Sequence, residues 1–97
     1  MNSPPTGKLR SSLDIEIRYE RSFLLDLEHL DAPSRRQVQQ FVLDDFVNLT
    51  HLHDLPEFRQ LGSSQIYYRF SLDRYLIGLE ITGKIIKFIR VIPKPDV

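Results

Sequence analysis

Basic side chains recur along the final third of the 97-residue sequence, at a spacing that suits contact with a phosphate backbone. Each lysine or arginine can neutralise one phosphate, and an exposed tyrosine can stack on a nucleobase. The candidate RNA contacts are Tyr67, Arg74, Lys84, Lys87 and Arg90, and Lys94 extends the series. The alternative interpretation is a strand face that is charged only because it is solvated.

A second group with possible chemistry is His51, His53 and Asp54, whose spacing could serve a metal ion or a proton transfer. No further histidine or carboxylate cluster lies nearby in the sequence, so a polar loop is the better interpretation. The sequence has no cysteine, which excludes thiolate zinc sites, disulfides and cysteine nucleophiles. It also has no glycine-rich phosphate loop and no G-x-S-x-G motif. We therefore expect no metal and no cofactor.

Net charge is zero, with 13 basic and 13 acidic side chains, and the pI is about 6.8. A neutral total argues against a domain that binds nucleic acid over its whole surface. The charge is unevenly distributed, however. Residues 1–58 hold 6 basic and 10 acidic side chains, a net of −4, and residues 59–97 hold 7 and 3, a net of +4. A basic surface is therefore expected in the second half of the chain.

The length and composition predict one folded domain over residues 13–97, preceded by a flexible tail at residues 1–12 that is rich in Pro, Ser and Gly. No apolar run approaches about 18 residues, and the first residues lack an apolar signal core. We therefore expect a soluble cytoplasmic protein. Leu13, Ile15 and Ile17 alternate with charged residues, which predicts a strand with one exposed face.

Two amphipathic helices are predicted next. Ser22 is a candidate N-cap for the first helix, and Pro33 suits the first turn of the second. The apolar stripe of the first helix contains Phe23, Leu24, Leu27 and Leu30, and that of the second contains Val38, Phe41, Val42, Phe46 and Leu49. Because the two helices follow each other closely, a helical hairpin is expected.

Residues 50–64 are predicted to be a loop held to the core by Leu52, Leu55, Phe58 and Leu61. Three alternating runs then predict strands at residues 65–72, 75–82 and 85–92, with apolar side chains such as Ile77 facing inward and Leu76 facing outward. Two-residue connections force neighbouring strands to be antiparallel. The predicted fold is α+β: a strand, two helices and a three-strand antiparallel meander, with the helical hairpin on one sheet face.

The meander resembles a sequence pattern of the RelE/ParE superfamily, the toxins of bacterial type II toxin–antitoxin systems. The segments IYYRF (66–70) and DRYLIGLEI (73–81) are similar to the family's YYRIR…GDYRIGFEI, and IKFIRV (86–91) is similar to its IIFIRV strand. Upstream, LPEF (55–58) and LG (61–62) resemble its LPGF..L.G segment. The resemblance covers residues 13–97 and implies the RelE-like fold.

The resemblance also implies a function and site residues. RelE-type toxins are ribonucleases that enter the ribosomal A site and cut mRNA without a metal ion, by attack of a ribose 2′-OH on the adjacent phosphate. Arg69 fills the first arginine of YYRIR, and Lys94 stands at the arginine of the family's VLHRKDIY segment, so these two are the implied catalytic residues. The implied partners are a cognate antitoxin, the ribosome and mRNA, with no membrane involved.

The sequence departs from the family where the chemistry should lie. Ser71 stands at the second arginine of YYRIR, Leu76 at the arginine of DYRI, and Pro93 at the histidine of VLHRKDIY, and the sequence stops before the tyrosine. We therefore expect a degenerate nuclease site and weak or absent cleavage. Two alternatives stay open: a ParE-like gyrase inhibitor that acts by binding, and a catalytically inactive RelE-fold binding or regulatory module.

Overall fold

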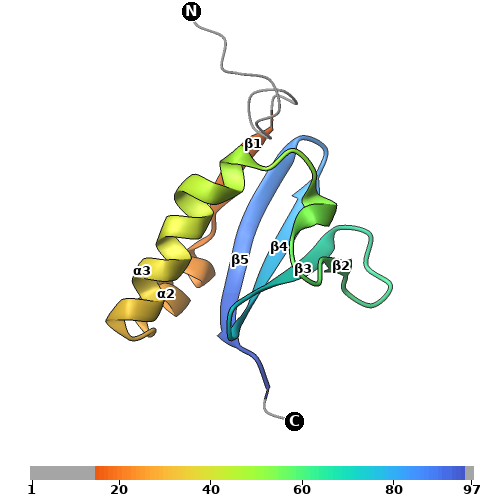
Figure 1. The fold of residues 1–97 in the computed structure, drawn as a ribbon. Coiled ribbons are helices and arrows are strands. Elements are labelled where there is room, and N and C mark those ends of the chain that lie inside the picture. The colour runs from red at the N-terminus through yellow and green to blue at the C-terminus, as the bar shows by residue number, and fades with distance from the viewer. Residues whose placement is uncertain (1–14, 96–97) are drawn as a thin grey trace, which may run out of the picture.

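A computed structural model describes residues 15–95 (Figure 1). The predicted tail at residues 1–12 and the strand residue Leu13 lie outside the described residues. The described chain forms a strand, two helices and then four further strands.

The sheet has five strands in the order β1-β5-β4-β3-β2. The three longest, β3 (Tyr67–Leu72), β4 (Tyr75–Thr82) and β5 (Ile85–Pro93), form the antiparallel meander that the sequence predicted. Strand β1 (Glu16–Tyr19) lies parallel to β5 at one edge. Strand β2 (Arg59–Gln60) pairs with β3 at the other edge, inside the segment predicted to be a loop. The predicted fold class is confirmed, with this short strand added.

Helix α2 (Arg21–Glu28) follows β1 directly. The prediction that Ser22 is its N-cap is wrong, because Glu20 takes that position. The Ser22 hydroxyl instead donates a hydrogen bond to the Ile89 carbonyl at 2.6 Å. Leu24 is 47% exposed, so its predicted place in the buried stripe is also wrong. Phe23 and Leu27 are buried as predicted.

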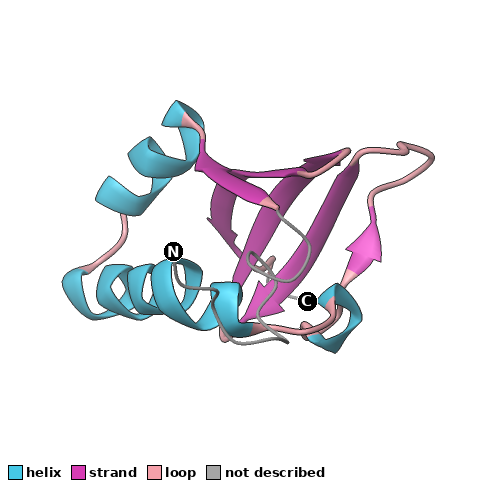
Figure 2. Ribbon diagram, turned by 90° about the horizontal axis from the view of Figure 1, so that it is seen from above, coloured by secondary structure: helices cyan, strands magenta, loops and turns pink. Residues whose placement is uncertain are grey.

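Helix α3 (Ala32–Gln40) begins as predicted, with Pro33 in its first turn and Asp31 as N-cap accepting from the Ser34 amide. The helical path continues through a π-helical turn (Phe41–Asp45) and a 3₁₀ turn (Phe46–Asn48). A second 3₁₀ turn (Leu52–Asp54) follows. Figure 2 shows both helices on one side of the strands, with α3 along one face and α2 beside the sheet edge.

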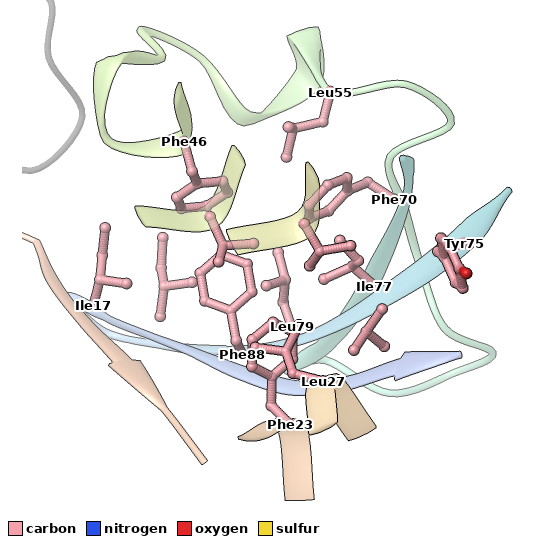
Figure 3. Packing of buried hydrophobic residues seen from close by; sticks show 14 residues of the cluster. Ile17, Phe23, Leu27, Phe46, Leu55, Phe70, Tyr75, Ile77, Leu79 and Phe88 are labelled. Carbon is pink, nitrogen blue, oxygen red and sulfur yellow. The ribbon is translucent and has the colours of Figure 1, made fainter. Parts of the chain in front are cut away.

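The core is an aromatic cluster between α3 and the inward sheet face (Figure 3). Phe46 is fully buried, and its ring centroid lies 4.9 Å from that of Phe88 and 6.2 Å from that of Phe70. Leu55 is buried and anchors the 50–64 segment as predicted, whereas Leu61 is 41% exposed and does not. With the helices packed on this face, the opposite face of the sheet is available for a site.

Candidate RNA-binding face

The sheet face opposite α3, called here the open face, carries a row of arginines that crosses four strands. The strand register places Arg59 opposite Arg69, Arg69 opposite Gly78, and Gly78 opposite Arg90. We call these four residues the arginine row. Gly78 has no side chain, so none stands between Arg69 and Arg90, whose Cα atoms lie about 10 Å apart across two strand spacings. This gap is wide enough for a phosphate group.

A bulge in β5 puts Arg90 in the row. The pairing of β4 with β5 shifts register between Gly78 and Leu79, which are opposite Arg90 and Phe88, so that Ile89 is the extra residue. In a regular strand, Lys87 and Arg90 would face opposite sides, because side chains alternate with a period of two. The extra residue brings both cations to the open face. The sequence prediction included both residues but missed the bulge that unites them.

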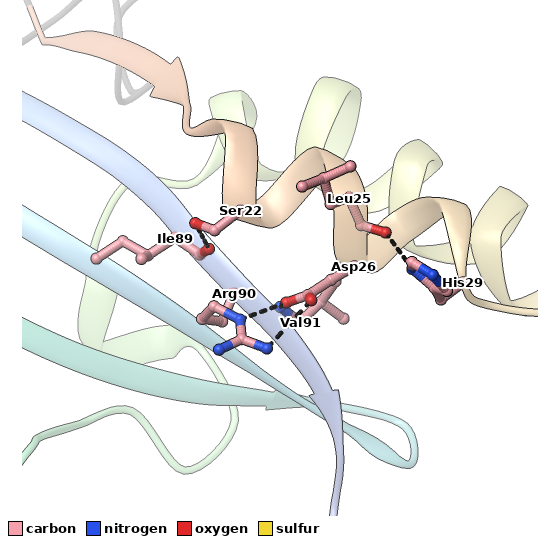
Figure 4. Close-up of polar contacts among 7 residues, drawn as sticks. All are labelled: Ser22, Leu25, Asp26, His29, Ile89, Arg90 and Val91. Carbon is pink, nitrogen blue, oxygen red and sulfur yellow. Dashed lines mark hydrogen bonds and ion pairs between the residues drawn. The ribbon is translucent and has the colours of Figure 1, made fainter.

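Helix α2 covers the edge of β5 where β1 has ended (Figure 4). The Asp26 carboxylate accepts hydrogen bonds from Arg90 Nε at 2.7 Å, Arg90 Nη2 at 3.2 Å and the Val91 amide at 3.0 Å. The Ser22 hydroxyl satisfies the Ile89 carbonyl on the same edge. Side chains of α2 thus replace the strand that would otherwise pair with this part of β5. The Arg90 guanidinium consequently points to the sheet edge and not across Gly78.

The Asp26 carboxylate stays ionised in this position. Its partial burial by itself raises the pKa, but the hydrogen bonds from Arg90 and the Val91 amide, with the charges of Arg90 and His29, outweigh that effect. The net result is a pKa of Asp26 below its usual value. The hydrogen bond to Asp26 and the charge of its carboxylate in turn raise the pKa of Arg90.

A second carboxylate, Glu57, binds Lys94, one of the two implied catalytic residues. The Ser71 hydroxyl donates to Glu57 Oε1, and Lys94 Nζ lies 3.4 Å from the same oxygen. Hydrogen bonds from Ser71 and then Lys94, the charge of Lys94 and the weaker effect of Arg69 lower the pKa of Glu57. Lys94 and Ser71, which departs from the family pattern, therefore both bind the Glu57 carboxylate, whereas Arg69 makes no ion pair with it within 4.0 Å.

The other predicted RNA contacts are spread over the sheet. On the open face, Lys87 Nζ lies 3.7 Å from Glu80 Oε2. Tyr67 of β3 is paired with Glu80 of β4 and is 40% exposed. Arg74 and Lys84 are not brought together, because they lie in turns at opposite ends of β4. Arg74 is 4.0 Å from Asp73, whereas Lys84 has no ion pair with any residue of the 15–95 range.

Apolar side chains adjoin the arginine row. Leu76 is paired with Ser71 on one side and with Ile92 on the other, and Ile92 is 40% exposed. As predicted, Leu76 faces away from the core, since Tyr75 and Ile77 on either side of it are buried. This position therefore offers an apolar contact where the family pattern has an arginine.

The two loop histidines lie apart from the open face. They line a cavity of about 500 Å³ with Phe58 and Tyr68, whose rings stack 5.4 Å apart. The His53 ring meets the edge of Phe58 at 5.5 Å. Within residues 15–95, no group of three possible metal ligands occurs. In the same range, no helix is long and apolar enough to cross a membrane.

No family model matches the sequence. The chain is 25% identical over 84 residues to toxin RelE3 of Methanocaldococcus jannaschii, a match that covers 86% of this chain and 94% of that protein. The crystal structure of a RelB–RelE antitoxin–toxin complex from Methanococcus jannaschii superposes with a TM-score of 0.62 at 25% identity, over 78% of this chain and 88% of that one.

Two further structures share the fold at lower identity. The toxin–antitoxin complex RelBE2 of Mycobacterium tuberculosis gives a TM-score of 0.65 at 16% identity, over 82% of this chain and 98% of that one. The chromosomal ParDE system of P. aeruginosa gives a TM-score of 0.57 at 11% identity, over 87% of this chain and 100% of that one. The chain is therefore similar to the RelE toxins of toxin–antitoxin systems, and it shares its fold with the solved toxins of such systems.

Proposed function

We propose that this protein is a RelE-type toxin that inhibits translation by cleaving mRNA on the ribosome, and that its open sheet face meets the RNA. The arginine row is the observation that carries this proposal. It aligns three arginines with Gly78 across four strands, with Arg69 beside the bare backbone of Gly78 and the Arg90 guanidinium held by Asp26 at the sheet edge. Tyr67, on the same face and two residues from Arg69, adds a ring for a base to stack on.

Cations are what the chemistry requires. When a ribose 2′-oxygen attacks the adjacent phosphorus, the bond to the 5′-oxygen breaks, and a proton passes from the 2′-hydroxyl to the leaving 5′-oxygen. Negative charge builds on the phosphate oxygens as this happens, and prepositioned donors stabilise it. Arg69 is the best placed donor, because it lies at the centre of the row and has no ion pair within 4.0 Å among residues 15–95.

Cleavage is expected to be slow. Leu76 has no charge to offer, Ser71 binds Glu57, and Lys94 is held by the same carboxylate. The loss of one prepositioned donor typically costs about 10²- to 10³-fold in kcat. We therefore propose a weakened nuclease, in which Arg69 is the main phosphate contact and Lys94 the secondary one.

The proposed partner is a cognate antitoxin, since the solved relatives include antitoxin–toxin complexes. The helical side of the molecule has apolar surface for such a partner. Leu24 and Leu25 on α2 and Leu43 on the π-helical turn are 47%, 42% and 59% exposed. These three leucines are the apolar contacts that we propose for the antitoxin.

The test is cleavage of mRNA on programmed ribosomes, with wild type, Arg69→Ala and Arg36→Ala compared. Arg36 is the matched control, because it is an exposed arginine of α3, remote from the open face. We expect slow cleavage by the wild type and by Arg36→Ala, and a loss of about 10²-fold or more in Arg69→Ala.

Other outcomes separate the alternatives. Growth arrest without ribosomal cleavage would contradict the nuclease, and inhibition of DNA supercoiling by the purified protein would then establish the ParE-like activity. Expression that leaves growth unaffected, together with absent cleavage, would identify an inactive binding module.

A further inference from the structure

The Asp26–Arg90 pair lies at the end of the arginine row, and this position suggests a role beyond holding α2. We propose that Asp26 is an internal competitor for RNA: it binds Arg90 in the free protein, and an RNA phosphate seated over Gly78 takes Arg90 from it. The proposal rests on the proposed function for the identity of the ligand, a phosphodiester of single-stranded RNA.

The backbone of Arg90 already belongs to the row. It lies opposite Gly78, and a Cβ atom built on Gly78 would be 3.9 Å from Arg90 Cβ. The surface over Gly78 therefore adjoins the stem of the arginine. Only the end of the side chain is directed elsewhere, to Asp26 at the sheet edge (Figure 4). A rotation of this side chain would place its guanidinium beside a phosphate that Arg69 holds from the other side.

The exchange is physically accessible because Asp26 has a second partner. When Arg90 leaves, the carboxylate still accepts from the Val91 amide at 3.0 Å, so it is not left without a donor. The Arg90 side chain is 56% exposed, so solvent and ligand reach it directly. The pair has two hydrogen bonds and the Asp26 side chain is only 19% exposed, so breaking it has a free-energy cost, and that cost is what makes Asp26 a competitor. A phosphate that offers two oxygens to the guanidinium can replace Asp26.

The experiment measures the binding of a fluorescein-labelled single-stranded RNA to the purified full chain by anisotropy, without ribosomes, over a range of salt concentrations. Asp26→Asn removes the competing charge and keeps an oxygen for the Val91 amide. Asp45→Asn is the matched control, because it makes the same change of charge at an exposed residue of the π-helical turn. Arg90→Gln is measured alone and in combination with Asp26→Asn.

We expect Asp26→Asn to bind the RNA about tenfold more tightly than wild type, because the charged contact between Asp26 and Arg90 no longer has to be broken. Its log–log salt dependence should match that of the wild type, because Arg90 neutralises the same phosphate in both complexes. Asp45→Asn should bind like the wild type. Arg90→Gln should abolish the gain in the double variant, and its effect should be larger in the Asp26→Asn background than alone.

Equal gains in Asp26→Asn and Asp45→Asn would overturn the proposal, because the effect would then be one of net charge. A gain that survives Arg90→Gln would overturn it as well, as would RNA binding absent in every variant. If Asp26→Asn does not fold, the Nε–Hε NMR signal of Arg90 in the wild type decides: it should shift with that of Arg69 on RNA addition, and a shift of Arg69 alone contradicts the exchange.

The result is separable from the test of the proposed function. Tighter RNA binding by Asp26→Asn without cleavage on ribosomes would support the competitor and refute the nuclease. Cleavage by the wild type, with no gain in Asp26→Asn, would do the reverse.

Discussion

Replacing Asp26 by alanine and by asparagine separates the two duties of this carboxylate. It binds the exposed Arg90, and it supplies the acceptor for the Val91 amide on an edge of β5 where no strand of residues 15–95 pairs beyond Phe88. Asparagine retains an oxygen for Val91 and loses the charge, whereas alanine loses both. The difference in unfolding free energy between the two variants therefore reports the amide hydrogen bond, once the difference in helix propensity between alanine and asparagine is subtracted.

The magnitude follows from the burial of the amide. A partly buried N–H without an acceptor costs about 1–3 kcal/mol. Alanine is a better helix former than asparagine, so its higher helix propensity within α2 reduces this loss of stability by up to about 0.7 kcal/mol. We therefore expect Asp26→Ala to be less stable than Asp26→Asn by about 1–2 kcal/mol. For a domain of this size, that corresponds to roughly 4–16 °C in Tm.

The assay is urea unfolding of both variants, with Glu28→Ala and Glu28→Asn as controls for helix propensity at an exposed residue of the same helix. If the two Asp26 variants differ by no more than the two Glu28 variants, then Asp26 does not hold the Val91 amide. That result would refute the edge-covering role of α2.

The pH dependence of the unfolding free energy shows whether the charge of the Asp26 carboxylate stabilises the fold. Because the folded protein lowers the pKa of Asp26, the ionised carboxylate stabilises the fold fully above the unfolded value of about 3.9. This contribution is lost as the pH falls through the lower folded pKa. The stability of wild type relative to Asp26→Asn should accordingly decline below about pH 4. A difference that grows on acidification would contradict the pKa direction.

Three further predictions concern the core, the open face and a turn. Phe46→Ala should lose about 3–5 kcal/mol in urea unfolding, because its ring is fully buried among other aromatic rings; a loss below about 1 kcal/mol would contradict that packing. Leu76→Arg should change stability by less than about 1 kcal/mol and steepen the salt dependence of RNA binding, and a collapse of Tm would show that Leu76 is a core residue. Gly83→Ala should cost about 1 kcal/mol through its φ of 58° alone, since a Cβ there meets no atom of residues 15–95 within 4 Å; unchanged thermal unfolding would contradict this.

The meander could be predicted because its signals are local. Alternation assigns each strand of residues 67–93 its inward face, and the two-residue connections force antiparallel pairing. Strand β2 could not be predicted in this way, since Arg59 and Gln60 show no alternation and become a strand only by pairing with Arg69 and Tyr68. Its absence from the prediction also concealed Arg59 as a member of the arginine row.

The contacts of α2 had no local signal at all. Ser22 is a favourable N-cap by type, yet its partner is the Ile89 carbonyl, 67 residues further along the chain. Asp26 finds Arg90 and Val91 over similar separations. The bulge at Ile89 was equally hidden, because an isoleucine fits either face of a strand. Apart from Arg59, the cations of the candidate site could therefore be predicted from sequence, and the carboxylates that hold them could not.

These carboxylates connect the two oppositely charged halves of the chain. Residues 1–58 carry a net −4 and residues 59–97 a net +4. Asp26 and Glu57, from the acidic part, pair with Arg90 and Lys94, from the basic part. Both pairs lie at the borders of the open face, one at the β5 edge and one beside Ser71 of β3. The charges of the two halves thus meet where the proposed RNA site lies. The affinity of this face for phosphate therefore depends on the free energy needed to separate each carboxylate from its cation.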